Sequence, residues 1–261
     1  MQFFHHPLVR HTQSKLHARS LTLLAGLEDN LGRIALWWMG AIAAAAALRI
    51  AISPLQSVQP ISVAPYLLLI CAPVASFFLA LRWFADGPAM PQPRIRLARI
   101  GRWRDVTSAE ASRHPLHGTS GIMVSLLIGM LLNVPVRAVE YLVTMPAIPP
   151  AVPGWLAVLH NAMTMDVVVI SSLYVIAFAM ALRRSPMFPR FLAMVWIADI
   201  AAQMLIARTV MATNVPPGVA AALHDLLQGN LTKVMISAGL WLPYLLLSTR
   251  VNVTFRHRVP R

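Results

Sequence analysis

The feature that most constrains this chain is a series of six long apolar segments. They cover residues 34–52, 61–81, 121–145, 155–182, 191–207 and 231–248. Each reaches the length of roughly 17–25 residues that a helix needs to cross the hydrocarbon core of a bilayer. Helices are expected because they satisfy their own backbone hydrogen bonds where no water is present. The sequence therefore predicts an all-α, polytopic integral membrane protein with six transmembrane helices, an N-terminal hairpin followed by a four-helix bundle.

Composition excludes a soluble enzyme. Of the 261 residues, 57% are hydrophobic and only 12% are charged, whereas soluble domains carry about 25% charged residues. Cys71 is the only cysteine, so neither an intrachain disulfide nor a cysteine zinc site can form. The histidines do not form paired metal-binding boxes, and we predict neither a metal nor a cofactor.

The basic residues indicate how the chain is oriented. Most of the 22 lysines and arginines precede the first apolar segment, follow the second, separate the fourth from the fifth, or follow the sixth. The intervening connections 53–59 and 146–154 contain none. Because cytoplasmic loops are enriched in basic residues, both termini are expected in the cytoplasm. Topology thus explains the net charge of +13, and we expect no nucleic-acid partner.

The chain divides at its long basic connection. We expect a cytoplasmic N-terminal segment, a transmembrane hairpin, a basic cytoplasmic linker, a four-helix membrane domain and a cytoplasmic tail, at residues 1–33, 34–81, 82–120, 121–255 and 256–261. Short links force the last four helices to be antiparallel neighbours, so they can close a bundle alone. The hairpin would then be an appended element, and a chain starting near His114 should still insert.

Arginines of the linker and tail are expected to bind anionic lipid head groups. Apolar residues alternate with the linker arginines, a pattern typical of a segment lying on a membrane surface. Each basic residue near such a surface contributes about 1 kcal/mol of attraction. The predicted lipid contacts are Arg94, Arg96, Arg99, Arg102, Arg104, Arg250 and Arg256.

The C-terminal sequence carries a resemblance to a known family. Its pieces are Trp241-Leu-Pro-Tyr244, Ser248-Thr-Arg-Val251 and Val253-Thr-Phe255, with Arg184-Ser-Pro-Met-Phe-Pro189 and the glycines of 118–121 upstream. Together they resemble the bacterial family named domain of unknown function 2569, over about 117–255. The resemblance implies a small four-helix inner-membrane unit. The preceding hairpin and basic loop depart from it, and because the family is uncharacterised it implies no activity.

Polar residues inside the apolar segments are the candidates for function. A charge at the centre of a membrane helix costs about 2.5–3.5 kcal/mol and marks a functional site by default. The candidates are Asn133, Arg137, Glu140, His160, Asp166, Asp199, Gln203 and Lys233. Arg137 and Glu140 are three residues apart, so they share a helix face and can pair. We predict a polar cluster among helices three to six that opens outward, capped by a short surface helix at 219–228.

Three functions remain open for that cluster. Its charges can pair only to hold the bundle together, with Lys233 as one partner of Asp166 and Asp199. They can instead line a solute or proton pathway, or serve catalysis. No HExxH, GxSxG or Ser–Lys motif is present. We therefore favour a non-enzymatic scaffold or accessory subunit with a protein partner or self-association in the membrane. A small-solute or proton-coupled transporter is the first alternative and an intramembrane enzyme the second.

Overall fold

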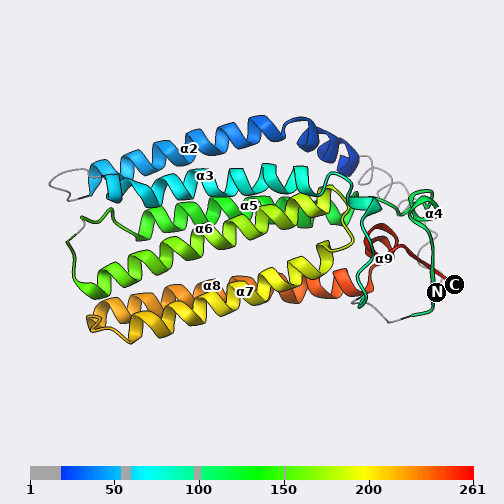
Figure 1. The fold of residues 1–261 in the computed structure, drawn as a ribbon. Helices are drawn as coiled ribbons and strands as arrows, with labels where there is room; N and C mark the ends of the chain where they lie inside the picture. Colours follow the sequence, from blue (N-terminus) through cyan, green and yellow to red (C-terminus); the bar gives the residue numbers. More distant parts are fainter. Residues whose placement is uncertain (1–18, 54–59, 97–100, 150) are drawn as a thin grey trace.

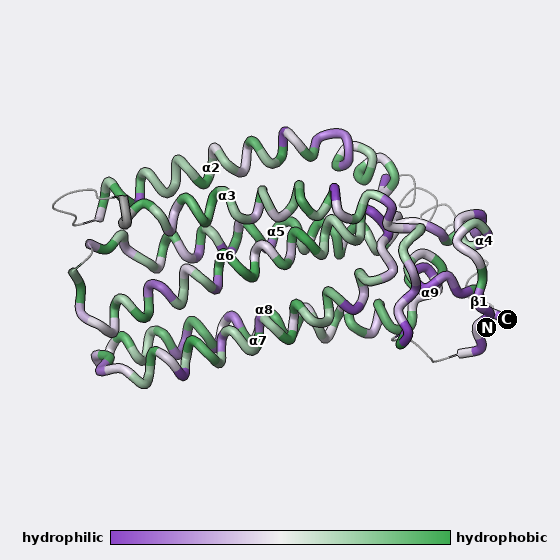
Figure 2. Tube along the Cα trace, in the orientation of Figure 1, coloured by the Kyte–Doolittle hydropathy of each residue, from purple (hydrophilic) through white to green (hydrophobic). Residues whose placement is uncertain are grey.

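Six long apolar helices lie side by side and form a bundle (Figure 1). The computed structural model describes residues 19–53, 60–96, 101–149 and 151–261. Its spanning helices are α2 (Leu31–Ile52), α3 (Pro60–Trp83), α5 (Ile122–Thr144), α6 (Gly154–Leu182), α7 (Phe188–Met211) and α8 (Pro217–Leu247). Figure 2 shows hydrophobic residues along these helices and hydrophilic residues gathered beyond one end. The predicted all-α, multi-pass membrane architecture is confirmed.

Helix α6 is the centre of the bundle. Most of its residues are buried, and Ala177, Phe178 and Ala179 are fully enclosed. Its most extensive contact is with α3, followed by α7 and α5. Phe77 of α3 packs against Phe178, with ring centroids 5.9 Å apart.

The N-terminal hairpin is part of this core. Ile42 of α2 and Leu69 of α3 are buried in the same cluster as Leu142 and Val167 of the following helices. Arg49 also donates a hydrogen bond to the carbonyl of Met145 over 2.9 Å. The expectation of an appended hairpin is therefore corrected, because α3 covers a face of α6 that would otherwise be bare.

Helix α8 is one continuous element of 31 residues. The sequence predicts a separate surface helix at 219–228, and this prediction is wrong. Only Gly229 and Asn230 separate the predicted surface helix from the predicted span that begins at residue 231. A helix tolerates one glycine at a cost of about 1 kcal/mol, so the two segments form one helix.

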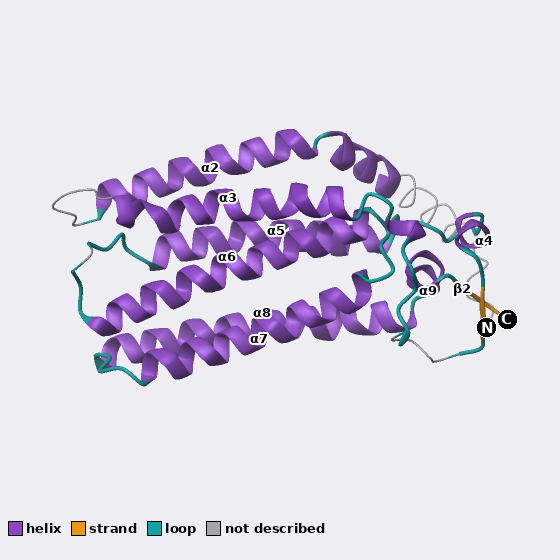
Figure 3. Cartoon of the chain, viewed as in Figure 1, coloured by secondary structure: helices purple, strands orange, loops and turns teal. Residues whose placement is uncertain are grey.

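Beyond one end of the bundle, the linker and the C-terminal tail fold together into a cap. We use this name for η2 (Gly87–Ala89), β1 (Trp103–Asp105), α4 (Ser108–Ser112), α9 (Thr249–Arg256) and β2 (Arg258–Pro260) with their loops. Strands β1 and β2 are antiparallel and pair Trp103 with Pro260 (Figure 3). The linker and the tail are therefore not independent segments.

Helix α9 carries the C-terminal part of the motif, and most of its side chains are buried. Val251, Val253 and Phe255 are buried, and Phe255 contacts Phe188 at the start of α7 with ring centroids 5.0 Å apart. The backbone N–H of Gly118 donates to the Thr254 hydroxyl over 2.9 Å. These contacts join the linker, the α6–α7 turn and the C-terminus.

Candidate functional site

A buried ion-pair network joins three helices in the middle of the bundle. Arg137 of α5 reaches Asp166 of α6 with an Nη1–Oδ2 distance of 3.3 Å. Its Nη2 also pairs with Oδ2 of Asp199 on α7. The side chain of Arg137 is 10% exposed and that of Asp199 is 0% exposed. Arg137 therefore pairs with two aspartates on other helices, and not with its neighbour Glu140 as the spacing suggests.

Hydrogen bonds complete the coordination of both aspartates. Gln203 lies four residues after Asp199 on α7, so the two side chains share a face. Its amide donates to Oδ1 of Asp166 over 3.1 Å, and the hydroxyl of Tyr174 donates to Oδ2 of Asp199 over 3.3 Å. The Arg137 guanidinium also lies 6.0 Å from the centroid of the Tyr174 ring. We call Arg137, Asp166, Asp199, Gln203 and Tyr174 the network.

A second ion pair connects α5 with α8. Lys233 Nζ pairs with Oε1 of Glu140, and the two side chains are 59% and 36% exposed. The sequence suggests Lys233 as a partner for Asp166 and Asp199, and this suggestion is wrong because Arg137 already binds both. Asn230 of α8 donates to Gln203 over 3.4 Å and so extends the network to α8.

His160 lies in a different cluster. Its Nε2 is 3.3 Å from the Tyr141 hydroxyl, and that hydroxyl is 2.6 Å from Oγ1 of Thr164. Burial of these three side chains among α5 and α6 makes a compact hydrogen-bonded group without a charged partner. His160 is therefore not a member of the predicted polar cluster.

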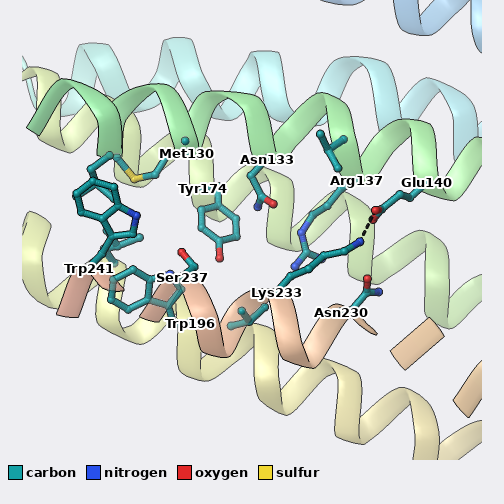
Figure 4. A pocket seen from close by; sticks show the side chains of 15 residues that line it. Met130, Asn133, Arg137, Glu140, Tyr174, Trp196, Asn230, Lys233, Ser237 and Trp241 are labelled. Atoms are coloured by element: carbon teal, nitrogen blue, oxygen red, sulfur yellow. Dashed lines mark hydrogen bonds and ion pairs between the residues drawn. The ribbon is translucent and has the colours of Figure 1, made fainter. Parts of the chain in front are cut away.

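A cavity of about 130 Å³ lies between α5 and α8, next to the network. Its walls are formed by side chains of α5, α6, α7 and α8, and Asn133, Tyr174 and Ser237 point into one space (Figure 4). Trp196 and Trp241 form its end nearer the cap, and the Glu140–Lys233 pair closes the other (Figure 4). Asn133, a predicted site residue, is thus placed on the cavity wall.

The charges of this region do not cancel. Arg137 and Lys233 carry two positive charges, whereas Glu140, Asp166 and Asp199 carry three negative charges when ionised. An uncompensated charge in a membrane interior is costly. A bound proton or a cation would bring the region to neutrality.

Sequence reasoning missed four residues of the site. Tyr174, Trp196, Asn230 and Ser237 all line the cavity. The first two lie within apolar runs, where aromatic residues are ordinary packing residues. Ser237 is a polar residue in a predicted span, so that signal was available, whereas Asn230 lies one residue before the predicted span 231–248.

The predicted lipid contacts fall into two groups. Arg94, Arg102 and Arg104 are exposed, Arg104 pairs with Glu110, and Arg99 lies outside the described residues. Arg96 instead bonds Oδ1 of Asp105 over 2.6 Å, and Arg250 donates to Oγ of Ser120 over 2.8 Å.

The predicted lipid contact of Arg256 is wrong, because its guanidinium is buried inside the cap. The residue is 3% exposed and donates to Oδ1 of Asn252 over 3.2 Å. Burial, with repulsion from Arg258 and Arg190, lowers the pKa of Arg256 to about 10.

Among the residues whose placement is described, no group of three histidine, cysteine or acidic side chains could hold a metal ion. Comparison of the chain with protein-family models, curated proteins and solved structures gave no match. The site must therefore be interpreted from its own geometry.

Proposed function

We propose that this protein is a small-solute transporter in which the network binds and releases a proton. The observation that carries the proposal is the position of the network beside a polar cavity inside the bundle. Charges that only brace helices need no cavity, and buried ion pairs are weak stabilisers compared with apolar packing. Ionisable groups beside a cavity at membrane depth are instead typical of ion and substrate pathways.

The excess negative charge supports coupling to protons. One proton on either aspartate makes the region neutral, and because both carboxylates share Arg137, a proton on one of them leaves the guanidinium to pair with the other. Losing that proton leaves one negative charge that a solute or a rearrangement of Arg137 must compensate. Proton binding by the network is thereby linked to the charge of the cavity wall and to the position of Arg137.

The proposal includes the orientation of the protein in the membrane. The concentration of arginines in the cap supports a cytoplasmic location for the cap, for the C-terminus and for the N-terminal segment, in a bacterial inner membrane. The Glu140–Lys233 pair would then close the cavity on the opposite, outward side. We also retain the proposal that the C-terminal half belongs to the family resembled by its motif.

Proton flux into reconstituted vesicles tests the function. Purified protein is inserted into vesicles that contain a pH-sensitive dye, and a membrane potential is imposed. We expect Asp166→Asn and Asp199→Asn to lower the protein-dependent flux at least tenfold. Asp225→Asn, at an exposed position on α8, is the matched control and should leave it unchanged. Wild-type flux equal to that of empty vesicles, or equal flux in all variants, would refute the proposal.

A scaffold or accessory subunit is the second candidate, and α8 supports it. Gln228, Thr232 and Lys233 are exposed on this spanning helix. Polar side chains within the membrane commonly contact a neighbouring helix, so a partner or a second copy would cover them. Native mass spectrometry in mild detergent tests this candidate. A single chain at every protein and detergent concentration would count against it.

A further inference from the structure

The cavity between α5 and α8 presents hydrogen-bonding groups that the protein itself does not use. Within the described ranges, the side chains of Asn133 and Ser237 make no hydrogen bond, although both line the cavity. Nε of Arg137 is buried and meets no acceptor among the same residues, and Nε1 of Trp196 is buried with only the Tyr174 hydroxyl as a neighbouring acceptor, outside ideal hydrogen-bonding geometry. Trp196 is 3% exposed, so bulk water does not solvate its indole nitrogen.

These groups define what a ligand must offer. The two nitrogens are donors only, whereas the Asn133 amide and the Ser237 hydroxyl each donate and accept. A polar group left unpaired in a membrane interior is costly. A ligand with acceptor oxygen and at least one donor would meet the needs of these four groups, which come from three helices.

The volume of the cavity and the charges around it further restrict which ligands can bind. The cavity volume of about 130 Å³ corresponds to roughly four water molecules at about 30 Å³ each. When the network has released its proton, the surrounding side chains carry an excess negative charge, so an anion would be repelled. A cation would have to lie against Arg137 and Lys233, which both line the cavity.

We propose that this cavity binds a small, uncharged solute of the polyol or amide class, which offers both acceptor oxygen and hydrogen-bond donors. Asn133, Ser237, Trp196 and the Nε of Arg137 form its hydrogen bonds, and the rings of Trp196 and Trp241 contact its apolar side. The proposal rests on the transport function proposed above and names its substrate class. Glycerol and urea are suitable probes, because each has only a few non-hydrogen atoms and no charge.

Solute permeability of reconstituted vesicles is the first test. Stopped-flow light scattering after an inward gradient of glycerol or urea measures entry of the solute. We expect at least one probe to enter several-fold faster than into empty vesicles. Ser237→Ala and Trp196→Phe each remove one hydrogen bond and should lower this rate about three- to tenfold.

Matched controls lie away from the cavity. Ser171→Ala removes a buried hydroxyl of α6 that has no partner in the described chain. Trp38→Phe removes an indole N–H that already donates to the carbonyl of Ile70. Neither variant should change the permeability. Equal effects of the control and cavity variants would overturn the proposal.

A labelling experiment reports binding without transport. In a Cys71→Ala background, Ser237→Cys gives one thiol on the cavity wall, and Ser171→Cys gives one inside α6. A small water-soluble methanethiosulfonate should modify position 237 and not position 171. Saturating glycerol or urea should slow the reaction at 237 several-fold.

The outcomes separate this proposal from the proposed function. Proton flux that depends on Asp199, without probe entry or protection of position 237, leaves transport standing and overturns the solute class. Protection of position 237 without any flux supports the binding site and refutes transport. Entry of a charged solute that is insensitive to Ser237→Ala and Trp196→Phe also overturns the solute class.

Discussion

Replacing Arg137 by methionine should destabilise the protein more than any other single charge removal in the bundle. The substitution keeps an unbranched side chain of similar length but leaves Asp166 and Asp199 without a cation. Their side chains are 6% and 0% exposed, so water cannot replace the guanidinium. Removing one partner of a buried ion pair costs about 3–5 kcal/mol. We expect a loss of this size in the free energy of unfolding.

The exposed ion pair provides the internal comparison. Lys233→Met breaks the pair with Glu140, whose side chain is 36% exposed. Such pairs contribute about 0–1 kcal/mol, so this variant should remain close to wild type. Both variants remove one positive charge from the same cavity wall, and only burial and the number of partners differ.

The triple variant Arg137→Met, Asp166→Asn, Asp199→Asn tests whether the unpaired carboxylates cause the loss of stability in Arg137→Met. If the loss comes from unpaired carboxylates, neutralising both should recover most of it, because the three residues form one network. Unfolding is followed by far-ultraviolet circular dichroism during titration of detergent-solubilised protein with sodium dodecyl sulfate. A loss for Arg137→Met within 1 kcal/mol of that for Lys233→Met, or no recovery in the triple variant, would refute the reasoning.

Three further predictions concern the cap and the hairpin. Gly87→Ala should disrupt the packing of the cap against the α6–α7 turn, because its Cβ would lie 1.9 Å from the Arg183 carbonyl oxygen. Its matched control Gly239→Ala meets nothing within 4 Å and should stabilise α8 by about 1 kcal/mol in the same unfolding titration. The cap should loosen on acidification. Burial, with repulsion from Arg184, lowers the pKa of His117, and burial with repulsion from Arg96 lowers the pKa of His257. Their stabilisation is complete above the ordinary histidine pKa of about 6.5 and is lost below it, so amide exchange in β2, corrected for its intrinsic pH dependence, should accelerate as the pH falls from 7 to 5. His117→Gln should flatten that profile, and an unchanged profile would contradict the assignment. A chain beginning at His114 should be degraded in cells, contrary to the sequence-based expectation, because α6 loses its contact with α3. Stable accumulation of a C-terminal reporter fusion at the full-length level would contradict this.

The spanning helices could be predicted because their signal is local. Each apolar run is long enough to cross a bilayer, and the structure moves the predicted ends by a few residues in most helices. The extension of α8 to Pro217 is the exception. Its first turns carry His224, Asp225 and Gln228, which resemble a surface segment in a hydropathy profile, while the backbone continues without a break.

The cap could not be predicted in the same way. Strands β1 and β2 are three residues long and pair Asp105 with Arg258 across more than half of the chain. Their sequence has no alternation long enough to indicate a strand. The linker arginines therefore suggested a lipid surface, whereas Arg96 and Arg258 both bind Asp105 and stabilise the strand pairing.

The network shows where sequence reasoning about charge ends. Spacing alone suggests Glu140 as the partner of Arg137, whereas in the structure Glu140 pairs with Lys233. The choice of partner depends on how α5, α6 and α7 are rotated about their axes, which brings Asp166 and Asp199 to the same guanidinium. The planar guanidinium of an arginine has several donors and can bridge two carboxylates, whereas the ammonium of a lysine is a single point charge. An arginine at position 137 is thus suited to two acidic partners, and the lysine at 233 to one. The difference between these two cations is visible in the sequence, but the sequence does not show which acidic residues each of them meets in the folded bundle.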